Sequence, residues 1–147
     1  MTVGARVIAE ARLWLGTPYL HQASVCGAGT DCLGLLRGIW RAIYGNEPES
    51  VPAYTADWAE PSREEVLLTA CQRWLEEKSD RPGEVGEVLL FRMRDGSIAK
   101  HLGLLSSTGS HARFIHSYTG YGVIESSLSA PWQRRLVARF AFPEGTN

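Results

Sequence analysis

The fold is decided by the stretch from residue 29 to residue 45, which reads Gly-Thr-Asp-Cys-Leu-Gly-Leu-Leu-Arg-Gly-Ile-Trp-Arg-Ala-Ile-Tyr-Gly. Its apolar residues recur with the period of an α-helix, which predicts a helix from Cys32 to about Gly45 that is buried over most of its circumference. Thr30 or Asp31 is placed to cap the start of this helix. The small and polar residues 21–30 before it are typical of a loop.

Other helices are predicted on both sides of this stretch. The same period predicts a capped helix over residues 3–15. Prolines predict an irregular connection over residues 46–61. Ser62 with Glu65 three positions later is typical of a capping box, which opens a helix that we expect to run to about Glu77.

The second half of the chain has a different character. Short runs rich in β-formers, separated by turn residues such as Asp95-Gly96 and Thr108-Gly109, predict about five strands: 87–92, 99–106, 113–118, 122–125 and 136–142. Helices followed by hairpin-linked strands indicate an α+β fold, in which the N-terminal helices pack on an antiparallel sheet. We expect one domain over residues 1–147, with a helical half to about residue 80 and a sheet half from about residue 81.

Composition excludes several classes of function. The chain has 147 residues, 44% of them hydrophobic and 21% charged, which is ordinary for a globular domain and unlike a disordered segment. Fifteen basic against sixteen acidic residues lack the basic excess of a nucleic-acid binder. No apolar run is long enough to cross a bilayer, so we expect no membrane insertion. The first residues lack a secretory signal, which predicts cytoplasmic synthesis and, if the protein leaves, a route this sequence does not encode.

Cys32 is the residue that points to chemistry. It stands where a glycine-containing loop meets the first turn of the predicted helix. Unpaired backbone amides and the helix dipole make such a position electropositive, which predicts a lowered thiol pKa and a nucleophilic thiolate. Taken alone, the cysteine could equally be a small core residue, since free cysteines are often fully buried.

A thiolate nucleophile needs a base, and the predicted sheet offers two histidines. His101 heads one strand, and His116 lies on the next. If the turn lies near Thr108-Gly109, these strands are neighbours, and both imidazoles can lie on one face of the sheet near one end. A helix-start cysteine with histidine on one strand and a polar residue on the next follows the logic of papain-like hydrolases. Each histidine alone could equally be a structural or surface imidazole.

The remaining cysteines and His111 predict little chemistry. Cys26 and Cys32 do not have the spacing of a zinc knuckle, and we expect no metal and no cofactor. A regulatory disulfide between these two cysteines stays open at this point. Cys71 has helical spacing with apolar neighbours and is predicted to be core, whereas His111 is predicted to be exposed in a turn.

Ordered motifs along nearly the whole chain resemble those of NlpC-type papain-like peptidases, which cut the stem peptides of bacterial peptidoglycan. The motifs are Gly16-Thr17-Pro18-Tyr19, Gly29-Thr30-Asp31-Cys32-Leu33-Gly34-Leu35, Pro82-Gly83-Glu84, His101-Leu102-Gly103 and Phe114-Ile115-His116. The branch encoded beside phage-tail and gene-transfer-agent tail genes is similar in further motifs: His21-Gln22-Ala23-Ser24, Asp57-Trp58 and Arg139-Phe140-Ala141-Phe142.

The resemblance implies roles for individual residues. Cys32 would be the nucleophile, with its own backbone N–H as one oxyanion donor, and His101 would be the general base and later the general acid. His116 would orient His101, and Tyr19 would position the substrate or polarise its carbonyl. Asp31 is expected to cap the helix and organise the loop, and its carboxylate would raise the thiol pKa.

Two departures from the wider family leave the substrate pocket unassigned. Leu33 follows the cysteine where serine is usual, and His21-Gln22 stands near the position of a frequent Gly-Gly pair. Both departures fit the tail-associated branch.

The resemblance also implies a function and a setting. We expect an endopeptidase for the bond between D-glutamate, through its γ-carboxyl, and the diamino acid. We expect it at the tip or baseplate of a phage-like tail, in contact with other tail proteins, opening the cell wall locally during DNA delivery. An N-acetylmuramoyl-L-alanine amidase with the same Cys–His site and a non-catalytic tail-tip subunit are the alternatives. Trp58 and Trp132 could dock on tail proteins, but core packing is the favoured expectation for both.

Overall fold

A computed structural model describes residues 1–48 and 65–144. Its helices and strands follow one another along the chain as α1 (Val3–Leu13), β1 (Ser24–Val25), β2 (Gly29–Thr30), α2 (Cys32–Tyr44), α3 (Val66–Trp74), β3 (Glu76–Glu77), β4 (Val88–Arg92), β5 (Ala99–Ser107), β6 (Arg113–Tyr118), β7 (Gly122–Ser127), α4 (Ala130–Arg135) and β8 (Leu136–Ala141). The Asp57-Trp58 motif lies outside the described residues, and so does Ser62, where the sequence predicts the start of a helix.

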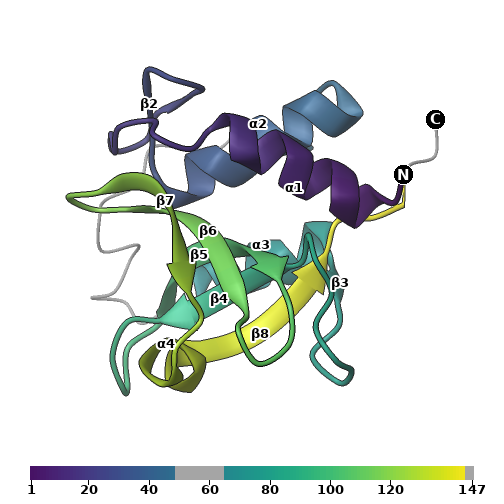
Figure 1. Ribbon diagram of the computed structural model, residues 1–147, viewed down its shortest axis with the longest axis vertical. Helices are drawn as coiled ribbons and strands as arrows, with labels where there is room; N and C mark the ends of the chain where they lie inside the picture. Colours follow the sequence, from purple (N-terminus) through teal and green to yellow (C-terminus); the bar gives the residue numbers. More distant parts are fainter. Residues whose placement is uncertain (49–64, 145–147) are drawn as a thin grey trace.

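The expected α+β architecture is confirmed. The main sheet has the strand order β3-β8-β4-β5-β6-β7, and each neighbouring pair is antiparallel. All five predicted strands are present, but the sheet has six, because the edge strand β3 pairs with β8. A separate two-stranded sheet, β1-β2, lies in the segment that the sequence predicts as a loop. Helices α1 and α2 lie together on one side of the main sheet, and α4 lies on the other (Figure 1).

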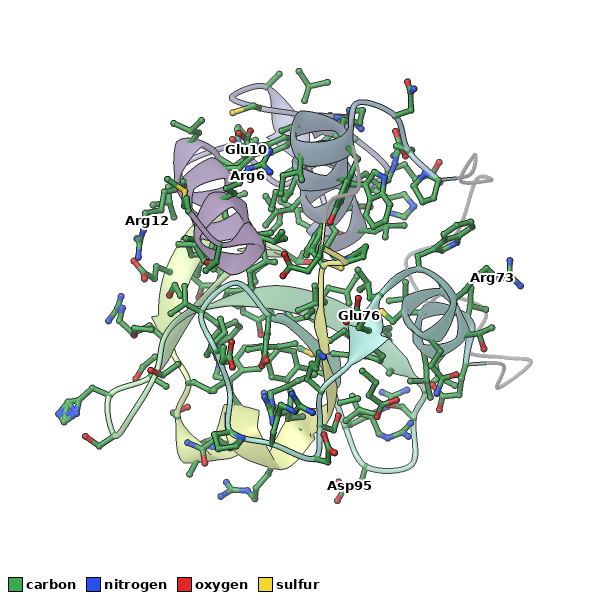
Figure 2. The ribbon with its side chains drawn as sticks, turned by 90° about the vertical axis from the view of Figure 1, so that its right-hand side faces the viewer. Arg6, Glu10, Arg12, Arg73, Glu76 and Asp95 are labelled. Atoms are coloured by element: carbon green, nitrogen blue, oxygen red, sulfur yellow. The ribbon has the colours of Figure 1, made fainter. Side chains whose placement is uncertain are left out.

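The larger core lies between the sheet and helices α1 and α2. Helix α1 buries four residues at helical spacing, Val3, Val7, Ile8 and Ala11. Its polar side chains, among them Arg6, Glu10 and Arg12, lie along the rest of the helix (Figure 2). Because apolar residues recur on one face only, burying that face against the sheet is what holds the helix in place.

A smaller core fills the opposite face of the sheet. Leu89, Phe91, Leu105 and Phe114 are its buried members, and Trp132 of α4 packs against them. Ring centroids of Trp132 and Phe91 are 5.1 Å apart. Core packing is therefore confirmed for Trp132. The two cores follow from the strict alternation of side chains along β4, β5 and β6.

One predicted helix boundary is wrong, and the predicted capping box lies partly outside the described residues. Helix α3 ends at Trp74 and not near Glu77, because Glu76 and Glu77 pair with β8 as an edge strand. Glu65 directly precedes Val66, the first residue of α3, and its side chain does not cap this helix. Its carboxylate instead accepts hydrogen bonds from Arg92 and from the backbone amide of Ala99, at 2.7 and 3.0 Å, and so ties the start of α3 to β4 and β5.

Among residues 1–48 and 65–144, no helix has the length and apolar character needed to span a membrane.

Candidate active site

Asp31, and not Thr30, caps helix α2. One carboxylate oxygen of Asp31 accepts a hydrogen bond from the Gly34 amide at 2.7 Å, and the other accepts one from the Gln22 amide at 2.7 Å. Gln22 has a φ of +66°, so the carboxylate holds this loop in a conformation that side-chain-bearing residues rarely adopt. The expected double role of Asp31 as helix cap and loop organiser is what the geometry shows.

Strands β5 and β6 separate at the point where α2 begins. Their pairing runs from Ser107↔Arg113 to Leu104↔Ile115 and ends there within the described strands. Beyond that point Ser117 of β6 donates a buried hydrogen bond to the Thr30 carbonyl, at 2.7 Å, and no longer follows β5. The chain just before α2 therefore lies against β6 where the ladder has opened.

The sulfur of Cys32 lies at this opening, beside the backbone of His101. Its thiol donates to the carbonyl of Lys100, with 3.9 Å between sulfur and oxygen, and the sulfur accepts from the amide of Leu102. Leu105 directs its amide and carbonyl towards β4, so by alternation the Leu102 amide is on the edge of β5 that faces β6. Cys32 thus occupies the place along β5 that a continuing β6 would take.

A β-bulge lies next to His101. Phe91 of β4 faces His101, but the following residue of β4 faces Ala99, which makes Lys100 an extra residue in β5. Bulges are frequent next to active sites, because they re-aim side chains and locally end regular pairing. Here the bulge adjoins both the Lys100 carbonyl that meets the thiol and the imidazole expected to be the base.

The two predicted imidazoles are in direct contact. His101 Nε2 and His116 Nδ1 are 2.7 Å apart, and both residues are buried, at 7% and 0% exposure. The other nitrogen of His116, Nε2, is 2.8 Å from the Ser126 hydroxyl on β7. A chain of polar groups therefore runs from β5 through β6 to β7.

Aromatic rings surround this imidazole pair. Phe114 lies 4.2 Å from His116 between ring centroids, and Trp132 lies 5.6 Å from His101 and 5.3 Å from His116. Tyr118 lies 5.6 Å from His101. The histidines consequently belong to the face of the sheet that α4 covers, whereas Cys32 packs in the core under α1 and α2.

Burial sets the protonation of the site. It raises the pKa of the Cys32 thiol to about 12; the carboxylate of Asp31 adds to the rise, while hydrogen bonds from the amides of Leu102, Leu33 and Cys32 itself oppose it. Burial also lowers the pKa of His101 to about 3, with His116 adding to the fall, and lowers the pKa of His116 to about 4.

The expectation of a lowered thiol pKa is therefore wrong for this structure. The helix-start amides do act in the expected direction, but the loss of hydration around a buried sulfur outweighs them. At neutral pH the resting site holds a thiol and two neutral imidazoles.

Tyr19 is near enough to the thiol for Cys32 to influence its pKa. Its hydroxyl is hydrogen-bonded to Thr119 of the β6–β7 turn, and burial raises its pKa, with a further rise from Cys32 and Asp31. Its backbone forms a bridge with Thr30. Asp31 therefore caps the helix that begins at Cys32, whereas Tyr19 is tied by its backbone to the residue before Asp31.

The other cysteines are separate from this chemistry. Cys26 is exposed, Cys71 is buried in the core as predicted, and all three cysteines are free thiols, so the disulfide considered between Cys26 and Cys32 is not formed. His111 is exposed, as predicted. Across the described part of the chain, no three His, Cys, Asp or Glu side chains are grouped in a way that could hold a metal ion.

Three features of the site have no counterpart in the sequence prediction: Ser126, Trp132 as a neighbour of the imidazoles, and the Leu102 amide. Ser126 pairs in register with Phe114 and not with His116, so only the diagonal across the β6–β7 ladder brings its hydroxyl to the ring. Strand periodicity alone could have placed Ser126 on the same face as His116. It could not have shown that Ser126 is close enough to bond.

Known proteins resemble this chain in structure but not detectably in sequence. No family model and no characterised protein matches the sequence. Among solved structures, an NLP/P60-family protein similar to a lipoprotein from Staphylococcus aureus Mu50 is 19% identical with a TM-score of 0.62, over 97% of this chain and 42% of that one. The NlpC/p60 domain of the peptidoglycan hydrolase SagA is 19% identical with a TM-score of 0.56, over 95% and 98% of the two chains.

Ly7917, solved with the hydrolyzing product of MDP, is 12% identical with a TM-score of 0.60, over 97% of this chain and 63% of that one. The chain thus spans less than two thirds of the S. aureus protein and of Ly7917. At identities this low, structural similarity shows the fold alone. The chain has the papain-like fold of NlpC/P60 proteins.

Proposed function

We propose that this protein is a cysteine peptidase that hydrolyses the stem peptides of peptidoglycan, with Cys32 as nucleophile and His101 as base. The observation that carries the proposal is the buried 2.7 Å contact between His101 and His116, formed where the Cys32 sulfur meets the backbone on both sides of His101. The names of two structures with this fold support the substrate class, since one is a peptidoglycan hydrolase and the other was solved with the hydrolyzing product of MDP.

The contacts of the imidazole pair define a proton arrangement suited to this role. A neutral imidazole carries one proton, on one of its two nitrogens. If His101 is to accept a proton at Nδ1, its own proton is on Nε2 and is donated to His116 Nδ1. His116 then carries its proton on Nε2 and donates it to the Ser126 hydroxyl oxygen. With this assignment each of the two hydrogen bonds, His101 to His116 and His116 to Ser126, has one donor and one acceptor. His116 then orients His101, and Ser126 orients His116.

The reaction we propose starts from the neutral thiol. As the Cys32 sulfur forms a bond to the substrate carbonyl carbon, its proton passes to His101 Nδ1. His101 then gives this proton to the departing amine nitrogen as the C–N bond breaks, which leaves a thioester. Water attacks the thioester with His101 again as base, and the returning proton restores the thiol. The Cys32 amide at the start of α2 would stabilise the oxyanion in both steps.

The buried state of the thiol makes general-base assistance necessary. A thiol with a pKa near 12 is almost entirely protonated at neutral pH, so the proton has to be removed during the attack. In the reaction we propose, His101 is the group that accepts this proton.

The bond and the setting are finer proposals that rest on the motif resemblance. We propose cleavage between D-glutamate, through its γ-carboxyl, and the diamino acid. We also propose that the protein is synthesised in the cytoplasm, is carried at the tip or baseplate of a phage-like tail among other tail proteins, and acts in the cell envelope of the recipient.

The decisive experiment compares the native protein with Cys32→Ala on purified cell walls. The native protein should release soluble muropeptides, and Cys32→Ala should release none while particles assemble as before. Mass analysis of the products separates a new N-terminus on the diamino acid, expected for the endopeptidase, from peptide freed of glycan, expected for an amidase. Equal digestion by the two proteins would contradict the nucleophile. No digestion by either would favour the non-catalytic tail subunit.

A further inference from the structure

Two stacked tyrosines lead from the imidazole pair to the surface. The rings of Tyr118 and Tyr121, at the two ends of the β6–β7 turn, have centroids 5.7 Å apart and planes inclined by 9°. Tyr118 in turn lies 5.6 Å from His101 and 5.3 Å from His116. Tyr121 is 70% exposed. A row of rings therefore connects the expected general base with solvent.

The turn that carries these rings is tied to the site. The Tyr121 amide donates to the Tyr118 carbonyl at 2.9 Å, which closes the turn. The Val123 amide donates to the Thr17 carbonyl at 2.9 Å, and the hydroxyl of Tyr19 is hydrogen-bonded to Thr119 at the tip. The position of Tyr121 relative to the thiol is consequently set before any substrate binds, which lowers the entropy cost of using it as a contact.

The exposed face of Tyr121 has the chemistry of a carbohydrate contact. An aromatic face carries partial negative charge and attracts the weakly positive C–H bonds that cover one side of a pyranose ring. We propose that Tyr121, held flat by Tyr118, binds a sugar ring of the glycan strand to which the stem peptide is attached. This inference rests on the proposed function and adds a glycan contact to it.

The ring-to-ring distances limit how far a sugar on Tyr121 can lie from the cleaved bond. Two ring-to-ring steps of 5.6 and 5.7 Å separate His101 from Tyr121. An extended peptide spans about 3.3–3.6 Å per residue, so two residues cover about 7 Å. In the proposed substrate two residues, an alanine and the D-glutamate, lie between the sugar and the cleaved bond. The two steps together place the Tyr121 ring at most about 11 Å from the His101 ring, which is more than these two residues reach, so the link between the alanine and the sugar has to span the rest.

An apolar peptide side chain is the less suitable occupant. Apolar groups bind best in concave sites that remove most of their surface from water. The outer ring of a stack that is itself 70% exposed offers a flat face open to solvent, which can cover one side of a planar partner only. A sugar keeps its hydroxyl groups hydrated in such an arrangement.

The test uses two substrates with the same peptide, one free and one attached to its disaccharide. The native protein should hydrolyse the disaccharide-linked peptide with the higher kcat/KM. Tyr121→Ala should lower the ratio of the two kcat/KM values about 3- to 10-fold, the range expected for loss of one aromatic contact. Tyr121→Phe keeps the ring and should keep the ratio. Leu13→Ala removes a side chain of similar exposure, 69%, from α1 and should also keep it.

Titration of the Cys32→Ala protein with the peptide-free disaccharide gives a second readout that does not need turnover. We expect binding that Tyr121→Ala weakens by the same factor. Hydrolysis of both substrates at equal kcat/KM by the native protein would overturn the glycan contact while leaving the peptidase intact. If neither substrate is hydrolysed, the peptidase proposal fails, and the glycan contact then stands or falls on the titration alone.

Discussion

The two faces of the main sheet differ in what they contribute to the site. The face under α1 and α2 supplies a sulfur held by backbone groups, with amides of α2 and β5 around it. The face under α4 supplies two imidazoles held by aromatic rings and a serine. A closed antiparallel sheet would keep the two sets apart. The sulfur reaches the backbone on both sides of His101 because β6 leaves β5 after Leu104↔Ile115, which opens the sheet at the start of α2.

The imidazole side should show the largest effect of substitution. His101→Ala removes the proton acceptor, and we expect kcat/KM on wall peptides to fall about 10³-fold or more. His116→Ala leaves His101 without its orienting partner and should cost less, whereas His116→Gln offers an amide oxygen to the His101 N–H and should restore part of the loss. Steady-state kinetics on a soluble muropeptide measure all three. Equal losses for His116→Gln and His116→Ala would argue against an orienting role.

The close approach of β6 to β5 beside the imidazoles requires a glycine at position 103. A Cβ at this position would lie 2.7 Å from the Phe114 ring and 3.3 Å from His116 Cβ, so a side chain here pushes β6 and its imidazole away. We expect Gly103→Ala to lower kcat/KM about 10- to 100-fold, through the imidazole contact, and to lower the free energy of unfolding by about 1–3 kcal/mol. Gly109→Ala has open space around it but a φ of +91°, so it strains the backbone of the β5–β6 turn without contacting the histidines and serves as the control for activity. Native activity in Gly103→Ala would show that the histidine contact tolerates displacement.

Acid should destabilise the imidazole side specifically. The pKa values of His101 and His116 are lowered to about 3 and about 4, below the usual 6.5. Between pH 6.5 and about 4 the unfolded chain binds more protons than the native protein, so the free energy of unfolding decreases as pH falls through this window. Each histidine contributes up to about 1.4 kcal/mol per pH unit. Denaturant unfolding at pH 7.5 and 5.0 should show a smaller decrease for His101→Gln than for the native protein.

The sulfur side should respond more weakly, through Asp31. Its carboxylate raises the thiol pKa, so Asp31→Asn should lower that pKa and speed alkylation of Cys32 at pH 8 several-fold. The same change places an amide NH₂ against the Gln22 N–H and should cost about 1–3 kcal/mol of stability. A Cys26→Ser background removes the exposed thiol from the assay. Slower alkylation in Asp31→Asn would contradict the assigned influence of the carboxylate.

The elements that could be predicted are those with strong periodicity. Helix α2 and the hairpin strands β5 and β6 follow from spacing and residue type, because burial of one face decides them. The same pattern places a cap at Thr30 or Asp31, and the structure selects Asp31. The strand β3 could not be predicted, since two glutamates carry no strand signal and pair with β8 only once that strand is in place. Helix α4 is too short to show a period.

The candidate site also has features that local sequence patterns predict and features that they do not. The motifs name Cys32, His101 and His116 as candidates, and the structure brings the two imidazoles into contact. The protonation of the thiol depends on how far burial outweighs the helix-start amides, which no local pattern reports. The opening between β5 and β6 is likewise a property of three packed segments, and the partner Ser126 reaches His116 only across a diagonal of the ladder.

The covalent intermediate offers the most direct measurement of the central claim. Protein mixed with a soluble stem peptide, quenched in acid and digested, should carry the acyl mass on the fragment that contains Cys32. His101→Ala protein treated in the same way should carry none. An acyl group on Cys26, the exposed thiol, or its equal appearance on Cys32 with and without His101, would contradict a thiol that reacts only through the neighbouring imidazole.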